Sequence, residues 1–341
     1  MSSLRTRLCR ELGIEYPICS VGMGMAAGPE LAAAVSNAGG FGVLGTHDLA
    51  AAPLQASITR TRQLTDQPFG VNVIIADDGS EKDRAVLVGA VGAAVAERPA
   101  AVVLFWGDPA PYVPVAHAAG VKVFLQVGSV AEAQAAAVAG VDAVITQGVE
   151  AGGHVRGTSS IWELLPAAVA AVGELPVLAS GGIGDGVGIA RALRLGAQAV
   201  SLGTRFVASE EALVHPAHKQ RILESTATDT VYSELYDAWW PGAPHRTLRN
   251  RTFQAWEAAG RPPPGRRPGE GTVIGTRQLS SGQVQPWPRY AVGIVPPSFE
   301  GDLQAVPMLA GESCGVVNDI KPAAAIVRDL ARDAAAALGS S

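Results

Sequence analysis

The chain has 341 residues, of which 48% are hydrophobic and 17% charged, a balance typical of a protein with a large buried core. Its net charge of −5 argues against nucleic acid as a partner, because nucleic-acid-binding proteins normally carry an excess of basic residues. No uncharged apolar run reaches the roughly 20 residues that a membrane span needs, and no apolar run follows the arginines near the N-terminus. We therefore expect a cytoplasmic protein without a membrane or nucleic-acid partner.

The three cysteines, Cys9, Cys19 and Cys314, are far apart in the sequence and form no C-x-x-C pair. Zinc sites and disulfide frameworks normally place cysteines at short, recurring spacings. The sequence therefore predicts neither a metal site nor a disulfide framework.

Short apolar runs rich in β-branched residues recur along the chain as far as residue 202. They do not alternate apolar with polar residues, which is expected of parallel strands covered on both faces. The predicted strands are Tyr16–Val21, Phe41–Leu44, Phe69–Ile75, Ala101–Trp106, Val121–Val127, Ala143–Thr146, Pro176–Ala179 and Ala199–Leu202.

Alanine-rich segments with apolar residues at helical spacing lie between these runs, for example Pro29–Ala38, Val130–Ala139 and Val187–Leu195. Such segments end at glycines, among them Gly39 and Gly140, because glycine readily adopts the left-handed conformation that closes a helix. Eight strand–helix units predict a (β/α)8 barrel, the TIM barrel. A doubly wound open sheet is the alternative, but it rarely contains so many units.

The repeating pattern stops after about residue 225. The following stretch holds a tryptophan pair, Trp239 and Trp240, and a piece rich in proline, glycine and arginine from Arg261 to Gly269. We interpret residues 231–297 as an inserted lid subdomain over the barrel mouth, and residues 1–230 with 298–341 as the barrel. Helical periodicity returns at Pro322–Leu338, which we expect to pack back on the barrel.

Glycines at the ends of the last two predicted strands indicate a phosphate site. In parallel barrels the active site lies at the carboxyl ends of the strands, and a phosphate commonly rests on the loops after the seventh and eighth. Gly181 and Gly182 allow backbone N–H groups to approach an anion, and Gly203 is followed by the hydroxyl of Thr204. Each glycine alone is better explained as a tight turn, but together they predict phosphate binding.

His154 follows the glycine pair Gly152-Gly153 after the sixth predicted strand. The two glycines have no side chains, so a flat ring system can lie close to the backbone beside His154. A histidine in a cleft has a pKa suited to proton transfer near neutrality. Glu150 is the nearest acid, and we weigh catalysis against a loop or helix-cap contact for it.

Polar and sulfur-bearing residues near other strand ends are further candidates for cofactor contacts. Asn72 and Gln126 lie near the ends of the third and fifth predicted strands, where each amide could reach a ring edge or serve a turn. Met23 and Gly24 close the first predicted strand, and a methionine suits packing against an aromatic ring as well as a core.

Together these residues resemble the nitronate monooxygenase family, formerly the 2-nitropropane dioxygenases, which also includes FMN-dependent enoyl-acyl-carrier-protein reductases. The resemblance covers nearly the whole barrel. Its segments are Pro17-Ile18, Met23-Gly24, residues 38–42, Phe69–Asn72, Gln147–His154, Ser180–Ile183 and Gly203-Thr204.

The resemblance implies non-covalent FMN, with His154 as catalytic base or electrostatic partner. The implied FMN contacts are Asn72, Gln147, Gly152, Gly182, Ser201, Leu202, Gly203 and Thr204. A further loop, Gly311, Glu312 and Ser313, matches a family segment that also approaches the flavin.

The resemblance implies oxidation of a nitronate by O2 to a carbonyl compound and nitrite. The alternative is an NAD(P)H-dependent reductase of an enoyl thioester, supported by the excess of arginine between Trp240 and Tyr290, which could dock an anionic handle or be a solvated surface. A non-catalytic flavin-binding barrel is a further alternative. The partners are then a small-molecule substrate with O2, or an acyl thioester with NAD(P)H, and both a monomer and a homodimer remain open.

Overall fold

The computed structural model describes residues 4–46, 51–76, 81–279 and 281–339. Its central feature is an eight-stranded parallel sheet with the strand order β1-β9-β8-β6-β5-β4-β3-β2. Each of the eight predicted strands is present. They are β1 (Ile18–Ser20), β2 (Gly42–Leu44), β3 (Phe69–Ile74), β4 (Ala101–Phe105), β5 (Lys122–Val127), β6 (Ala143–Gln147), β8 (Val177–Ser180) and β9 (Ala199–Leu202).

The sheet closes into a barrel through its first strand. β1 pairs with β9 in the register Cys19↔Ser201, and on its other side Cys19 bridges Phe41 next to β2. The Ser20 N–H donates to the Phe41 carbonyl at 3.0 Å. The predicted TIM barrel is therefore confirmed, and the open sheet is not the fold.

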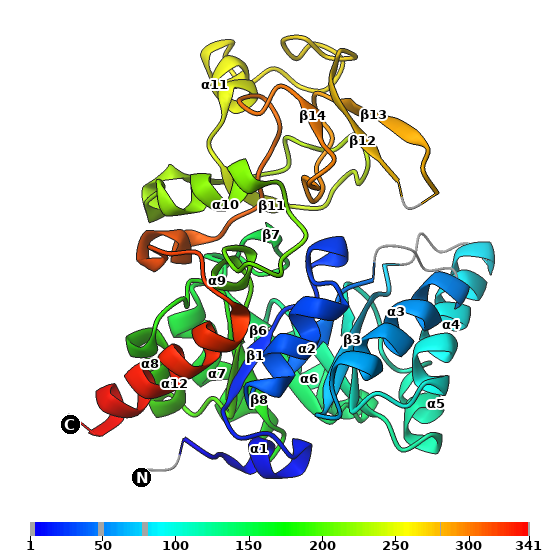
Figure 1. Ribbon diagram of the computed structural model, residues 1–341, viewed down its shortest axis with the longest axis vertical. Helices are drawn as coiled ribbons and strands as arrows, with labels where there is room; N and C mark the ends of the chain where they lie inside the picture. The colour runs from blue at the N-terminus through cyan, green and yellow to red at the C-terminus, as the bar shows by residue number, and fades with distance from the viewer. Residues whose placement is uncertain (1–3, 47–50, 77–80, 280, 340–341) are drawn as a thin grey trace.

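Helices surround the barrel in alternation with its strands (Figure 1). They are α2 (Pro29–Asn37), α3 (Ala51–Leu64), α4 (Glu81–Ala96), α5 (Val113–Ala118), α6 (Val130–Ala139), α7 (Ile161–Val172) and α8 (Gly186–Arg194). The glycines predicted to close helices adopt the left-handed conformation, with φ of 88° at Gly39 and 84° at Gly140. The predicted closing helix is α12 (Ala323–Gly339), which packs against α8 so closely that a Cβ at Gly186 would lie 2.5 Å from the Ala334 nitrogen.

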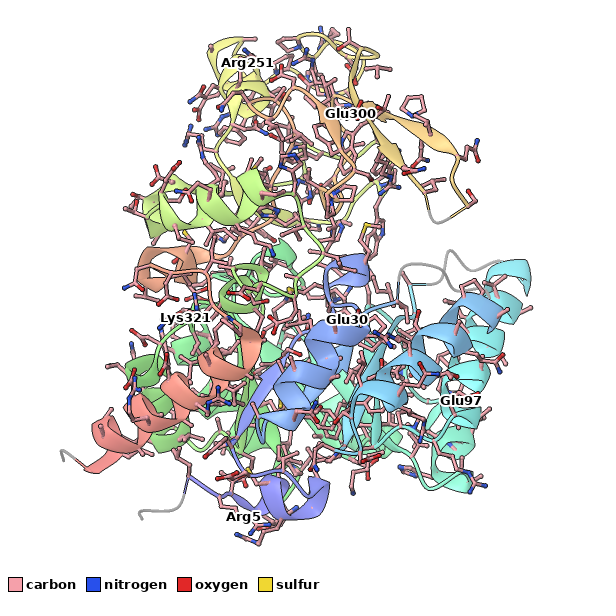
Figure 2. All side chains as sticks on the ribbon, viewed as in Figure 1. Arg5, Glu30, Glu97, Arg251, Glu300 and Lys321 are labelled. Carbon is pink, nitrogen blue, oxygen red and sulfur yellow. The ribbon has the colours of Figure 1, made fainter. Side chains whose placement is uncertain are left out.

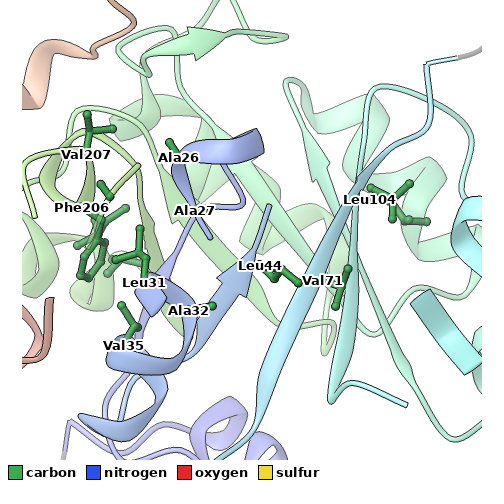
Figure 3. Close-up of a cluster of buried hydrophobic side chains, with 14 of the residues drawn as sticks. Ala26, Ala27, Leu31, Ala32, Val35, Leu44, Val71, Leu104, Phe206 and Val207 are labelled. Atoms are coloured by element: carbon green, nitrogen blue, oxygen red, sulfur yellow. The ribbon is translucent and has the colours of Figure 1, made fainter. Parts of the chain in front are cut away.

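The core has two parts because each strand is buried on both faces. Between the sheet and the helices, α2 contributes Leu31 and Val35, which lie near Phe206 (Figure 3). Inside the barrel a second cluster forms around Phe41 and Phe124, whose rings lie 6.1 Å apart. The short helix α1 (Arg7–Leu12) contributes its apolar residues to this cluster, so the interior is a packed core.

Two small antiparallel sheets stand beyond one end of the barrel, in the upper part of Figure 1. One contains β7 (Gly153–His154), β10 (Thr230–Ser233) and β11 (His245–Leu248), and the other contains β12 (Val273–Gln278), β13 (Val284–Pro288) and β14 (Glu300–Gly301). The accompanying helices are α9 (Thr204–Val207), α10 (Pro216–Leu223) and α11 (Arg251–Ala258), with 3-10 turns η1 (Gly24–Ala26), η2 (Ala227–Asp229) and η3 (Glu312–Val316). The lid boundaries at residues 231 and 297 stay a prediction. Within the described part of the chain, no helix is long and apolar enough to cross a membrane.

Candidate active site

A cavity of about 550 Å³ lies at the carboxyl ends of the barrel strands. One side of it, here called the floor, consists of residues from the barrel strands and the loops that follow them. The opposite side, here called the roof, consists of Trp239, Trp240, Arg277, Val292, Gly293 and Ile294. Floor and roof come from parts of the chain far apart in sequence, so the cavity forms only when the C-terminal sheets cover the barrel mouth.

Most of the residues predicted for the site line this cavity. They are Met23, Gly24, Asn72, Gln126, Gln147, Gly152, His154, Gly181, Gly182, Ser201, Gly203, Thr204 and Ser313. Three others lie behind the lining. Leu202 points into the hydrophobic core, the Gly311 N–H donates to the Thr204 hydroxyl, and Glu312 forms an ion pair with Arg246. The structure thus brings the predicted residues together, while their roles stay predictions.

The loop after β8 has the backbone that a phosphate cradle needs. Gly181 and Gly182 have φ of +100° and +69°, a region that residues with a side chain rarely adopt. A Cβ would also lie 3.0 Å from the Gly148 carbonyl oxygen at Gly181, and 3.0 Å from the Glu150 Cβ at Gly182. Two consecutive residues of the loop therefore carry no side chain, which allows an anion to approach their backbone N–H groups closely.

The end of β9 adds room and a hydroxyl to this cradle. At Gly203 a Cβ would meet nothing closer than the Met23 sulfur at 3.8 Å, so protein packing does not require a glycine there. The Thr204 Oγ1 accepts the Gly311 N–H at 2.9 Å, which orients the hydroxyl and leaves its own proton for donation to a ligand oxygen. These residues fit the phosphate of a nucleotide cofactor.

The side-chain amides of Asn72 and Gln147 form hydrogen bonds with the protein backbone. Asn72 lies within β3, where its Nδ2 donates to the Val103 carbonyl at 2.9 Å. Gln147 donates from Nε2 to the His154 carbonyl at 2.9 Å and accepts the Arg156 N–H on Oε1 at 3.0 Å. Gln147 therefore fastens the loop that carries His154, a positioning role that the sequence does not reveal.

Met23 and Gly24 lie beyond the strand that they were expected to close. β1 ends at Ser20, and Met23 instead precedes the 3-10 turn η1, which starts at Gly24. The expectation of a strand end is wrong here, because the backbone of this segment must pass close to β3. A Cβ at Gly22 would lie 2.2 Å from the Asn72 Cβ.

His154 belongs to β7, a short strand that leaves the barrel and pairs with β11 in the register His154↔His245. Its ring lies 4.3 Å from that of Trp240, 5.8 Å from that of His245 and 6.1 Å from that of Trp106, measured between centroids. Its Nδ1 is covered from solvent and has no hydrogen-bond partner among the described residues. The imidazole is thus surrounded largely by aromatic rings.

This environment corrects the expected protonation of His154. Burial, followed by the neighbouring His245, lowers the pKa of His154 to about 4. The expectation of a pKa near neutrality is wrong, because the aromatic wall removes the water that would solvate an imidazolium. At neutral pH His154 is an uncharged imidazole, which can accept a proton or donate a hydrogen bond but offers no positive charge.

His245 and Trp106, two of the rings around His154, are held in different ways. Hydrogen bonds hold His245, and a backbone with positive φ places Trp106. The His245 Nδ1 donates to the Ala243 carbonyl at 3.0 Å, and its Nε2 accepts the Tyr236 N–H at 3.3 Å, so both ring nitrogens are occupied. Trp106 has φ of +69°, which is rare for a bulky residue and suggests a functional constraint. Its ring contacts both His154 and Trp240.

Glu150 forms hydrogen bonds at the start of α7 and does not line the cavity. Its carboxylate accepts a hydrogen bond from the Ile161 N–H at 3.0 Å and another from the Ser160 hydroxyl, at the start of α7. Of the two interpretations weighed for Glu150, the helix-cap contact is the one that the structure contains.

The arginine-rich stretch is mostly an ion-paired network, which neither interpretation from the sequence described. Arg267 is buried and pairs with Asp237 and Glu270. Arg251, labelled near the top of Figure 2, pairs with Asp302. Arg277 differs, since it lines the cavity and forms no ion pair with any described residue. The sequence signal for the roof was the tryptophan pair, although nothing in the sequence linked it to His154.

The described residues contain no group of three or more His, Cys, Asp or Glu side chains that could hold a metal ion.

Comparison with known proteins places this site in a family. The sequence profile described as "Nitronate monooxygenase" matches residues 5–333. The chain belongs to the nitronate monooxygenase family. The resemblance drawn from the sequence is thereby confirmed, and the protein is a flavin-dependent oxidoreductase of this family, whose members bind FMN.

The relatives differ in activity. A nitronate monooxygenase of Pseudomonas aeruginosa is 36% identical over 296 residues, covering 75% of this chain and 83% of that protein. A (3aS,4S,5R,7aS)-5-hydroxy-7a-methyl-1-oxo-octahydro-1H-indene-4-carboxyl-CoA dehydrogenase of Rhodococcus jostii is 38% identical over 260 residues, covering 76% of this chain and 70% of that protein. Among solved structures, FabK from Thermotoga maritima is similar with a TM-score of 0.78 and 32% identity over 98% of both chains. Membership of the nitronate monooxygenase family thus leaves the substrate open.

Proposed function

We propose that the protein binds FMN in the cavity and oxidises a nitronate with O2 to a carbonyl compound and nitrite. The observation that carries the proposal is an uncharged His154 at the edge of a cavity whose floor ends in a glycine phosphate cradle. FMN, when bound, supplies the redox chemistry by taking electrons from the substrate and passing them to O2. Family membership supports the cofactor, and the nitronate monooxygenase relative supports the substrate class.

Apart from His154, the chain's own residues then have three tasks. The N–H groups of Gly181 and Gly182 and the hydroxyl of Thr204 hold the phosphate of FMN. Gln147 keeps the His154 loop in place through its two backbone hydrogen bonds. The roof tryptophans cover the reacting region and keep water from it.

His154 acts on the anionic group of the substrate in this proposal. With a pKa of about 4 it is uncharged at neutral pH, so it can donate a hydrogen bond to a nitronate oxygen. A nitronate has already lost its Cα proton, so His154 acts as a base only when the neutral nitroalkane is bound instead. In this proposal His154 acts on the anionic group as an uncharged hydrogen-bond donor. If a nitronate needs a cation, the cation has to come from another residue.

A second candidate function is oxidation or reduction of an acyl thioester. The observation that favours it is Arg277, a cation at the cavity without a carboxylate partner among the described residues, which could receive a phosphate of a coenzyme A handle. One relative is named as a carboxyl-CoA dehydrogenase, and FabK shares the fold over nearly its whole length. A reductase of this kind would take its electrons from NAD(P)H.

One experiment separates these functions. The purified protein is examined for a flavin spectrum and then mixed anaerobically with propyl-2-nitronate and, separately, with NADPH. Bleaching of the flavin by the nitronate alone supports the proposed function, and bleaching by NADPH alone supports the thioester reductase. Flavin that neither reagent reduces supports a non-catalytic barrel, and a protein that binds no FMN contradicts the proposal.

A further inference from the structure

Arg277 is an unusual cation for its position in the molecule. Three other arginines with buried side chains, Arg205, Arg246 and Arg267, each have a carboxylate within 4.0 Å, at N–O distances of 2.7, 3.2 and 2.8 Å. Arg277 is partly buried in the roof and has no such partner among the described residues. Moving a charge out of water without a counter-ion costs free energy. An unpaired arginine at a cavity therefore indicates that a ligand supplies the counter-ion.

The guanidinium is held in a fixed place by neutral contacts. Its central carbon lies 4.6 Å from the Trp239 ring centroid and 5.3 Å from that of Trp287, within the range of cation–π attraction. Its Nε donates to the Gln285 Oε1 at 2.8 Å across the β12–β13 pair. Trp287 is fully buried and donates from Nε1 to the Ala291 carbonyl, so the support itself is rigid.

These contacts leave the two terminal nitrogens of Arg277 without a protein acceptor among the described residues. Such a planar pair of N–H donors matches the two oxygens of a carboxylate, nitronate or phosphate group. Burial also lowers the pKa of Arg277, which an anion beside it would offset. The guanidinium can therefore bind the oxygens of an anionic group with both terminal nitrogens.

We propose that Arg277 anchors an anionic oxygen group of the substrate in the roof of the cavity. The inference rests on the proposed function, in which the cradle at Gly181, Gly182 and Thr204 already takes the phosphate of FMN. Arg277 comes from β12 in the roof of the cavity, whereas the cradle residues lie at the ends of the barrel strands in the floor. It is joined to the reacting region through consecutive tryptophans, since Trp239 contacts Arg277 and Trp240 packs at a tilt against His154.

The anion has two chemical sources, the reacting nitronate itself or a phosphate on a thioester handle. The variants for the test are Arg277→Met, which removes the charge at similar length, and Arg277→Lys, which keeps the charge but loses the planar pair of donors. The matched control is Arg289→Met, on the same side of the molecule but outside the cavity lining. All are prepared with FMN, and their flavin content is measured first.

Two binding measurements distinguish the sources. The dissociation constant of propyl-2-nitronate is taken from the concentration dependence of anaerobic flavin bleaching. Calorimetry gives the dissociation constants of coenzyme A and of pantetheine, which lacks the phosphates. We expect Arg277→Met to weaken one of the two anions by about 10- to 100-fold, Arg277→Lys to weaken it less, and Arg289→Met to leave it unchanged.

Selective weakening of the nitronate assigns the anion to the reacting group, and selective weakening of coenzyme A assigns it to the handle. The inference is overturned if neither anion is weakened, if pantetheine is weakened as much as coenzyme A, or if the wild-type protein binds neither anion. Loss of the proposed function gives a different result, because a protein without bound FMN fails before Arg277 is changed.

Discussion

The floor and the roof of the cavity are built from different kinds of groups. The floor offers backbone N–H groups, a hydroxyl and amides at the ends of barrel strands, held by the hydrogen bonds of the sheet. The roof offers large side chains, two tryptophans and an arginine, on loops and a hairpin. Trp239 and Ile294 pack against the main apolar core, and Val292 belongs to a small separate cluster. The difference suggests a division of labour, in which the floor binds a cofactor common to the family and the roof selects the substrate.

His154 lies where the two regions meet. It is carried on the loop after β6, yet β7 pairs with β11 of the C-terminal sheets, so its position depends on both. A change confined to the floor should therefore affect cofactor binding, a change confined to the roof should affect the substrate, and a change at His154 should affect turnover alone.

The largest effect is expected at this junction. His154→Ala should reduce turnover by about 100-fold or more, since general acid–base groups contribute on that scale, while FMN stays bound. The measurement is kcat together with the flavin content of the purified variant. His117→Ala is the control, because His117 is an exposed histidine that pairs with Asp142 on the barrel exterior. Unchanged turnover in His154→Ala would remove this residue from the mechanism.

The next effect concerns the stability of the contact between α10 and the chain at Leu309. His218 is fully buried on α10, and its ring bonds the carbonyl of Leu309, a cavity residue, through Nε2 at 2.9 Å. Burial lowers the pKa of His218 from 6.5 to about 4, so folding disfavours its protonated form. The stability that this provides is complete above pH 6.5 and is lost as the pH falls towards 4.

By pH 5 the loss from His218 alone should reach about 2 kcal/mol in the free energy of unfolding. Urea unfolding at pH 7 and pH 5 measures it, and His218→Phe should show a smaller difference between the two pH values than the wild-type protein. Equal pH dependence in the two proteins would mean that His218 is not the group being protonated.

The floor is tested by a single added methyl group. Gly182→Ala forces a side chain into a backbone with φ of +69° and places its Cβ 3.0 Å from the Glu150 Cβ. A positive φ costs a residue with a side chain roughly 1–2 kcal/mol, so FMN affinity should fall by about 10-fold if the bound form needs this backbone. Gly120→Ala is the matched control, with φ of +74° and open space around its Cβ. A similar loss of FMN affinity in both variants would assign the effect to general destabilisation.

The sequence predicts the floor of the cavity better than the roof. The barrel strands, the helix-ending glycines and the gathering of residues such as Asn72, Gly182 and Thr204 were predictable, because parallel strands end at a common edge. Local periodicity and glycine spacing are sufficient for such features. The roof depends on contacts between distant segments, which local patterns do not encode.

Two residues illustrate what the sequence could not supply. Arg277 is one of many arginines in its stretch, and only the tertiary structure distinguishes it from Arg267, which has two carboxylate partners. The glycines beside His154 point to it, but its depressed pKa comes from burial and from His245, which lies some 90 residues away along the chain. The protonation state of a residue is set by the side chains that fold around it, so it has to be taken from the structure.

The smallest expected effect tests whether the roof tunes His154. Trp240→Phe replaces the ring nearest the imidazole, at 4.3 Å, with a smaller one, which should admit water and move the pKa of His154 up from about 4. Because the proposed mechanism uses the uncharged imidazole, the acidic limb of kcat/KM should shift to higher pH, with activity near pH 5 reduced by about twofold and activity at pH 8 unchanged. Trp256→Phe is the control, since Trp256 packs on Phe253 outside the cavity. A uniform decrease at all pH values would instead indicate that Trp240 contributes to substrate binding, and the roof would then select the substrate without setting the protonation of the group that reacts with it.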